Sequence, residues 1–213
     1  MVFAAYILGA LILCRIPVIG RYLCIIHTMI HEVGHALCSL LFDGKVRSIS
    51  LFANTEGLIM TGSKSWIGRV MTSFAGYPFS SAFALLCFTL ISKGHASWVF
   101  YGLGITISAA LLLWVRNMYG VFWCISFLVL LVLIMIRGND LWIIHGGMLM
   151  SAILLTESIS SAFMVLYLSF KTPGEAGDAA SLAAYTQIPA QIWGILFFAF
   201  ALFSFTKVCI SLL

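Results

Sequence analysis

Apolar runs, each about as long as a lipid bilayer is thick, follow one another along most of this 213-residue chain. Hydrophobic residues make up 62% of the sequence and charged residues only 8%, whereas a soluble domain carries about 25% charged residues. We therefore expect most of the surface to face lipid. A helix of roughly 20 apolar residues spans the bilayer core. By this criterion the sequence predicts seven candidate spans, at about residues 2–19, 22–42, 66–91, 96–115, 118–136, 141–170 and 188–212.

The first of these runs differs from the others because Arg15 and Pro17 interrupt it. No Lys or Arg precedes it and no clear cleavage site follows, so we expect a retained membrane segment and not a cleaved signal peptide. No run of different composition separates the chain into parts. We predict an all-α polytopic membrane protein with about six to seven transmembrane helices and a small β-hairpin, organised as a single membrane-embedded domain over residues 1–213.

Two connections are longer than a tight turn. From Asp43 to Lys64, apolar and polar residues alternate up to Phe52, turn-forming residues (ANTEG) follow, and LIM then resumes the apolar run, which predicts a β-hairpin at about residues 45–61. The second connection, at about residues 171–189, combines turn formers with small residues that are able to lie re-entrant. Basic residues divide six against five between the two membrane faces, and this small excess favours a cytoplasmic location for the hairpin face.

The charge and cysteine patterns exclude some classes of function. The net charge of +4 is scattered, and neither a basic run nor a glycine-rich phosphate loop occurs, so nucleic acid is not an expected partner. None of the six cysteines forms a C-x-x-C pair, and all lie in apolar stretches. We expect them to act as small hydrophobic side chains.

The second run contains the pattern H-E-x-x-H, as His31, Glu32 and His35. Residues four apart share one face of a helix, so the two imidazoles can bind one Zn²⁺ at about 2.0–2.1 Å each. Zinc lowers the pKa of a water bound to it toward about 7, and the Glu32 carboxylate is then placed to accept the proton of that water. The pattern predicts a metal site whose activated water attacks a carbonyl group, such as that of a peptide bond, and so hydrolyses the bond.

A hydrogen-bonded structural cluster is the alternative explanation of the same residues, because H-E-x-x-H also occurs by chance on polar helix faces. At membrane depth, however, a charged group costs roughly 2.5 kcal/mol or more and is functional by default. Three ionisable residues within five positions of an apolar run therefore favour metal binding.

A catalytic zinc usually has three protein ligands, so one more must come from elsewhere in the chain. His27 extends the stripe, but it lies about 12 Å along the helix from His35, and we expect it to pack or hydrogen-bond beside the site. Asp178 in the late connection and Glu157 within the sixth run are both at a suitable depth, and the residues alone leave this choice open. The alternative role of Asp178 is a helix N-cap, and that of Glu157 is a carboxyl paired with a neighbouring helix. Weaker candidates, in loops or at a far edge, are Glu56, Asp140, His145 and Glu175.

Five segments carry a more specific signal: HEVGHAL at 31–37, KVRSISL at 45–51, AGYPFSSAFA at 75–84, VRNMYG at 115–120 and GDAASLAAYTQIPAQIWG at 177–194. In this order, and over most of the chain, they resemble site-2-protease-type intramembrane metallopeptidases. The resemblance is closest to a compact bacterial branch that is common in actinobacteria. The first segment is shared by many zinc peptidases, whereas the ensemble is much more specific.

The resemblance implies a membrane-embedded zinc peptidase that cuts its substrate within or beside the bilayer. His31 and His35 would be metal ligands and Glu32 the general base. In the wider family the third ligand is an aspartate in a late Leu-Asp-Gly motif. This chain departs from that motif, and GEAGDAAS stands at the matching place. The resemblance therefore favours Asp178 as the third ligand.

Two other segments acquire expected roles from the resemblance. AGYPFSSAFA is expected to pack near the zinc helix, where Gly76 and Pro78 would let a helix break and backbones approach. Asn117 lies in a matching segment and is given no role. An exposed strand edge within residues 46–60 would hold an unwound substrate by β-augmentation. The alternative is a hairpin that only covers the metal site.

The predicted function is an intramembrane zinc metalloendopeptidase, a multi-pass hydrolase of the cell membrane with Zn²⁺ as its cofactor. Its expected partners are the lipid bilayer and a membrane-associated protein or peptide substrate. One alternative is a catalytically inactive zinc-binding membrane scaffold, which would need no base at Glu32. Another is a metal transporter with the stripe of His27, His31 and His35 as its pathway. A transporter requires ionisable residues at successive depths on several spans, and apart from Glu157 the sequence shows no such ladder.

Overall fold

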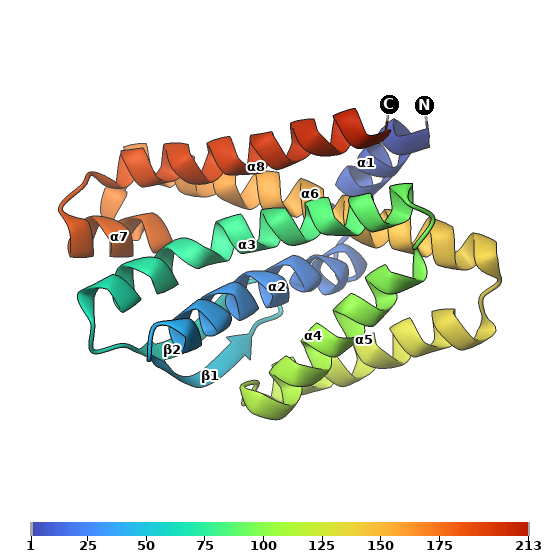
Figure 1. Cartoon of the computed structure of the whole chain (residues 1–213), viewed down its shortest axis with the longest axis horizontal. Helices are drawn as coiled ribbons and strands as arrows, with labels where there is room; N and C mark the ends of the chain where they lie inside the picture. Colours follow the sequence, from blue (N-terminus) through green and yellow to red (C-terminus); the bar gives the residue numbers. More distant parts are fainter. Residues whose placement is uncertain (1, 213) are drawn as a thin grey trace.

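The computed structural model describes residues 2–212 and confirms the predicted fold class, an all-α polytopic membrane protein with a small β-hairpin (Figure 1). Its helices within that range are α1 (Val2–Leu13), α2 (Ile19–Leu41), α3 (Trp66–Ser92), α4 (Ser97–Leu113), α5 (Met118–Arg137), α6 (Asp140–Lys171), α7 (Asp178–Thr186) and α8 (Ala190–Leu212). The strands are β1 (Lys45–Leu51) and β2 (Gly57–Gly62), and a short 3₁₀ turn, η1, covers Pro173–Glu175.

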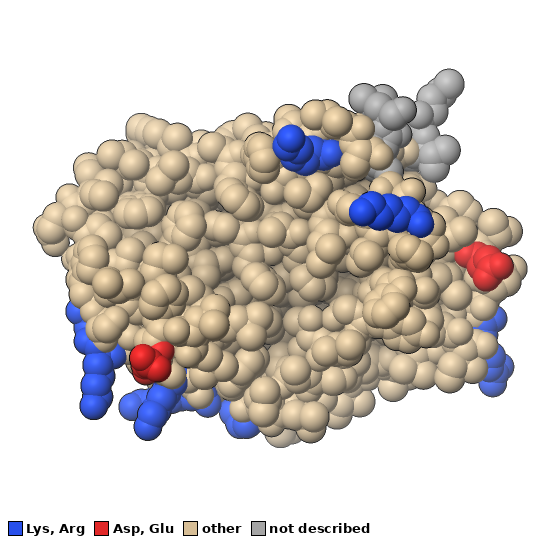
Figure 2. Space-filling model, viewed as in Figure 1, with Lys and Arg blue, Asp and Glu red and all other residues tan. Residues whose placement is uncertain are grey.

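Five of these helices, α2, α3, α5, α6 and α8, are long and apolar enough to cross a membrane. α4 is apolar but shorter, with 17 residues, which correspond to about 26 Å. α1 is shorter still, because the chain turns after Leu13. The face in view in Figure 2 carries few charged side chains, as expected of a surface in contact with lipid. The chain is therefore a multi-pass membrane protein.

α1 and α2 run in the same direction and together form one interrupted crossing. Residues further along α1 and α2 lie beside residues further along α6. The pairs are Tyr6 with His145, Cys14 with Glu157, and His27 with Ser161. Both helices therefore follow α6 from its start toward its end. The run predicted as a separate first span at about 2–19 is the first part of this interrupted crossing. α1 begins and α8 ends at the same end of the molecule (Figure 1).

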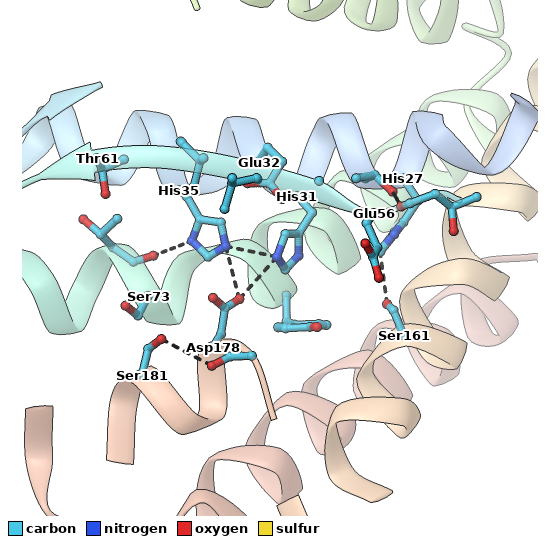
Figure 3. Close-up of a pocket in the computed structure, with 18 of the residues that line it drawn as sticks. His27, His31, Glu32, His35, Glu56, Thr61, Ser73, Ser161, Asp178 and Ser181 are labelled. Atoms are coloured by element: carbon cyan, nitrogen blue, oxygen red, sulfur yellow. Dashed lines mark hydrogen bonds and ion pairs between the residues drawn. The ribbon is translucent and has the colours of Figure 1, made fainter. Parts of the chain in front are cut away.

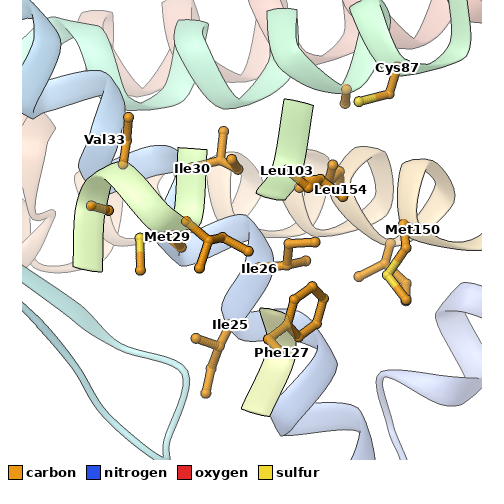
Figure 4. Close-up of a cluster of buried hydrophobic side chains, with 14 of the residues drawn as sticks. Ile25, Ile26, Met29, Ile30, Val33, Cys87, Leu103, Phe127, Met150 and Leu154 are labelled. Carbon is orange, nitrogen blue, oxygen red and sulfur yellow. The ribbon is translucent and has the colours of Figure 1, made fainter. Parts of the chain in front are cut away.

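The hydrophobic core surrounds α2. Figure 4 shows side chains of α2 against residues of α3, α4, α5 and α6. The apolar stretch of α2 is 67% buried, whereas the corresponding stretches of α5 and α8 are each 28% buried. α2 is thus the most enclosed crossing, and the polar residues that it carries are kept away from lipid.

α3 continues unbroken through Gly76 and Pro78, so the helix break predicted there is wrong. Proline removes one backbone hydrogen bond, and transmembrane helices tolerate this loss where neighbouring groups satisfy the freed carbonyl. The expected close approach is confirmed. A Cβ added to Gly34 of α2 would lie 2.7 Å from the Cβ of Phe79 in α3, so the missing side chain lets these two helices touch.

The hairpin has one occupied edge and one open edge. β1 and β2 pair antiparallel, with Ile49 opposite Ile59. On the far side of β1, the Ile49 N–H donates to the Trp114 carbonyl at 2.8 Å, and the Ile49 carbonyl accepts from the Arg116 N–H at 3.2 Å. Among the described residues no strand pairs with the other side of β2. The open edge of the sheet is therefore that of β2.

The late connection is more ordered than predicted, because it contains η1 and α7. The small residues of α7 allow it to pack closely on α3. Trp66 at the start of α3 donates through its indole N–H to the Tyr185 carbonyl at 2.7 Å. The Arg69 guanidinium lies 5.6 Å from the centre of the Tyr185 ring. These contacts fix α7 at the same end of the molecule as the hairpin (Figure 1).

Candidate metal centre

Two imidazoles project from one face of α2, as their spacing predicts. The Nε2 atoms of His31 and His35 lie 3.0 Å apart, and the two rings are nearly perpendicular, at 84°. The helix is continuous from Ile19 to Leu41, so the four-residue spacing places both rings on successive turns. His35 is buried, with 4% of its surface exposed, and His31 is half-buried.

Asp178 completes this group from the opposite side of the cavity (Figure 3). Its Oδ2 atom lies 3.2 Å from Nε2 of His31 and 3.1 Å from Nε2 of His35. The alternative role as an N-cap is wrong, because Gly177 occupies the cap position and Asp178 is the first residue of α7. Burial by itself raises the pKa of the Asp178 carboxyl, but the adjacent imidazoles of His35 and His31 outweigh burial and hold it below its ordinary value.

The three atoms fit a single small metal ion. Their separations of 3.0 to 3.2 Å are close to the ~3.3 Å between two ligands of a tetrahedral ion with bonds of about 2.0–2.1 Å. Two neutral imidazoles and one carboxylate are also the donor set of many catalytic zinc sites. The residues present therefore fit Zn²⁺.

Gly76 forms the floor beneath the two imidazoles. A Cβ added there would lie 2.5 Å from Cε1 of His31 and 2.5 Å from Nε2 of His35. Both distances are shorter than real Cβ contacts, so no other residue leaves room for the rings in this arrangement. The expectation that AGYPFSSAFA lies near the zinc helix is confirmed, and Gly76 is its point of contact.

Two contacts from α3 orient the imidazoles. The backbone carbonyl of Thr72 lies 2.6 Å from Nδ1 of His35, which leaves Nε2 free to face Asp178 when Nδ1 carries the proton. The ring of Tyr77 packs edge-on against His31, with ring centres 4.5 Å apart. Both contacts hold the rings where a metal would need them.

Glu32 lies between α2 and β2 and lines the same cavity, whose volume is about 620 Å³. It is 6% exposed. A Cβ added to Gly57 would lie 2.5 Å from Oε1 of Glu32, so the carboxylate rests directly against the backbone at the start of β2. Figure 3 shows Glu32 beside the imidazoles and separate from the Asp178 carboxylate.

The other candidate ligands lie elsewhere. His27 is buried one turn before His31 and contacts the Ser161 hydroxyl at 3.5 Å, so it packs beside the site as expected. Glu157 is grouped with two cysteines and not with the imidazoles. Of the weaker candidates, Glu56 reaches the cavity rim, and the others remain at α6 or in the late loop: Asp140, His145 and Glu175.

Asn117 has a structural role that sequence reasoning missed. Its amide nitrogen donates to the Leu51 carbonyl at 2.6 Å, and its amide oxygen accepts from the Leu51 N–H at 3.1 Å. The side chain thus imitates a paired strand and closes the outer edge of β1. The only signal in the sequence was its place in a segment resembling the family, because the pairing joins residues 66 positions apart.

Comparison with known proteins identifies the family. The sequence profile described as Peptidase M50B-like matches residues 3–208, nearly the whole chain. A search of curated proteins and a search of solved structures each found no match. The profile does not distinguish a bacterial branch, so that part of the resemblance stays a prediction. The chain belongs to the Peptidase M50B-like family, a site-2-protease-type family of membrane metallopeptidases.

Proposed function

We propose that this protein is an intramembrane zinc endopeptidase in which His31, His35 and Asp178 bind the metal and Glu32 is the general base. One observation carries the proposal. Three ligand atoms from two distant parts of the chain lie within 3.2 Å of one another, in a cavity that also holds a buried carboxylate. We expect a membrane-associated protein or peptide as substrate and the cell membrane as the location.

The chemistry follows from these positions. When bound, zinc supplies a Lewis acid and a water of lowered pKa. Glu32 is placed to accept a proton from that water and to return it to the leaving amine of the peptide. Asp178 and the two imidazoles hold three ligand atoms within 3.2 Å of one another, so that one ion could contact all three. The enclosure of α2 keeps bulk lipid away from the reacting groups.

β2 is placed to bind the substrate. Gly57, Ile59 and Thr61 of this strand line the cavity. Because the N–H and carbonyl of Ile49 point away from β2, the pair Ile49–Ile59 is not hydrogen-bonded across the hairpin, and the N–H and carbonyl of Ile59 point to the open side. An unwound substrate segment would add there as a further strand. The role expected of residues 46–60 is thereby narrowed to the open edge of β2.

We expect Ile59→Pro to lower kcat/KM by about two- to tenfold, because one edge hydrogen bond contributes about 0.5–1.5 kcal/mol. The hairpin should persist, since the lost N–H is not bonded to β1. Ile59→Ala is the control, because it shortens the side chain and keeps the N–H. The cleavage rates of the two variants are compared, and both variants should keep the zinc content of the parent. Equal rates for the two variants would show that β2 only covers the metal site.

The proposal is tested by Glu32→Gln. We expect the rate of cleavage of a membrane-anchored peptide to fall by ~10²–10⁴-fold, the usual contribution of a general base, while the zinc content is unchanged. Glu56→Gln, at the rim of the same cavity, is the control and should cleave normally. A Glu32→Gln protein as active as the parent would remove Glu32 from the reaction.

The two alternatives make different predictions in the same assay. An inactive zinc-binding scaffold would show no cleavage in the parent protein, with Glu32→Gln indistinguishable from it. A metal transporter would carry zinc into vesicles regardless of Glu32. The enclosed position of Glu32 between α2 and β2 supports the peptidase, because neither alternative needs a general base beside the candidate metal ligands.

A further inference from the structure

A second cluster of metal-ligating side chains lies at the interruption between α1 and α2. It consists of Cys14, Cys24 and Glu157, whose ligand atoms, two Sγ and one carboxylate oxygen, all lie within 4.8 Å of one another. They come from the turn after α1, the first part of α2 and the middle of α6. Neither the predicted reaction nor the candidate metal centre uses them.

The turn between the helices brings the two thiols together. Val18 has φ 66° and ψ −64°, and the Ile19 N–H donates to the Pro17 carbonyl at 2.8 Å. This is a γ-turn, a three-residue turn that bends the chain between α1 and α2 without reversing its direction along α6. The interruption therefore lies beside α6 at the level of Glu157.

Gly20 allows the end of α1 to press against α2. A Cβ there would lie 2.4 Å from the Leu13 carbonyl oxygen and 2.7 Å from that of Cys14. Cys24 follows Gly20 by four residues and so shares its face of the helix. That face is the one in contact with Cys14, so close packing of the backbone sets the distance between the thiols.

The donor set suits a borderline-soft metal. Thiolate and carboxylate both bind zinc, at about 2.3 Å and about 2.0–2.2 Å, and donors on one tetrahedral ion then lie ~3.4–3.8 Å apart. Since no two ligand atoms of the cluster are more than 4.8 Å apart, a shift of about 1 Å or less brings them to this geometry. Cys24 is 4% exposed, whereas Cys14 and Glu157 are half-buried, so the cluster is not fully enclosed by protein.

The charges of an occupied cluster would balance. Two thiolates and a carboxylate carry three negative charges, which Zn²⁺ and one guanidinium neutralise. Arg15, which directly follows Cys14 in the chain, would supply that guanidinium. Among the described residues, Glu157 makes no ion pair within 4.0 Å. A carboxyl at this depth is costly without a partner, and a metal ion would supply one.

We propose that Cys14, Cys24 and Glu157 form a second, structural Zn²⁺ site that fixes the interrupted α1–α2 crossing to α6. The site is independent of the proposed peptidase reaction, because it shares no residue with the candidate metal centre. Its ligands also differ in kind, since the candidate centre offers only nitrogen and oxygen atoms.

Cobalt substitution separates the two sites. The purified, reduced protein is stripped of metal in detergent and titrated with Co²⁺, and the near-ultraviolet thiolate-to-cobalt charge-transfer band is recorded. We expect this band to be complete by two equivalents of Co²⁺ in the parent, which has both sites, and by one equivalent in His35→Ala. Cys24→Ser and Cys14→Ser should lose it. Cys124→Ser, which removes a buried thiol outside the cluster, should keep it, and Glu157→Gln should need more Co²⁺ to reach it.

The proposal is overturned if the reduced parent shows no charge-transfer band, or if Cys24→Ser retains it. If the band were lost in Cys124→Ser but kept in Cys14→Ser, the thiolate that binds cobalt would lie outside the proposed cluster. This result would also overturn the proposal. Elemental analysis provides a second measurement. The double variant Cys14→Ser/Cys24→Ser should hold one zinc fewer than the parent while its peptidase site keeps its own zinc.

Discussion

Asp178→Ala is expected to weaken zinc binding at the candidate metal centre by more than ~100-fold. Loss of a residue that only supports a metal ligand costs about 10–100-fold in metal affinity, and Asp178 is one of three groups placed to bind the ion directly. Cleavage should fall below detection at ordinary zinc concentrations. The affinity is measured by competition with a chelator of known affinity, and cleavage is measured on a membrane-anchored peptide.

Glu175→Ala is the matched control, because it removes a carboxylate from the same connection, three residues earlier, on an exposed position. It should leave zinc affinity and cleavage unchanged. If Asp178→Ala bound zinc as tightly as Glu175→Ala, Asp178 would not be a ligand, and the contact with the imidazoles would be only an ion pair.

Gly76→Ala should inactivate the protein although no polar atom is changed. The added methyl group would lie 2.5 Å from both imidazoles, so the rings must move by about 1 Å. A displacement of 1 Å can cost 10²-fold in rate, and here it moves two ligands at once. We expect a loss of cleavage of roughly 10²-fold or more, with weaker zinc binding, while helix content and detergent stability persist because alanine is a better helix former than glycine.

Gly104→Ala provides the comparison for that substitution. Gly104 lies within α4, and an added Cβ would meet nothing within 4 Å. The same chemical change should therefore be neutral or slightly stabilising. If Gly76→Ala cleaved as well as Gly104→Ala, the imidazoles would not occupy the positions described.

The sequence predicted the parts of this structure that depend on local spacing. The apolar runs, the hairpin and the shared face of His31 and His35 all follow from periodicities within one segment. Asp178 was different, because spacing alone could not separate it from Glu157. Asp178 was favoured as the third ligand only by the resemblance of its segment to the peptidase family. In the structure Asp178 contacts imidazoles that precede it by more than 140 positions.

Other features were not predictable because they arise from packing between distant segments. The turn after α1 sets the direction of the first crossing, and no residue pattern shows that α1 and α2 both follow α6. Pro78 predicted a break that α3 does not have, since the surrounding helices tolerate one missing hydrogen bond. Cys14 and Cys24 each lie in an apolar stretch, and only the fold places them beside Glu157.

The proposed function depends on His31, His35 and Asp178 holding one zinc ion. The most direct measurement is the zinc-edge X-ray absorption spectrum of the Cys14→Ser/Cys24→Ser protein, in which the candidate centre is the one proposed zinc site that remains. We predict one zinc per chain, with two imidazole ligands, only nitrogen and oxygen neighbours, and loss of the metal in His35→Ala. A metal-free protein, or a zinc with sulfur neighbours, would show that these three residues do not hold zinc.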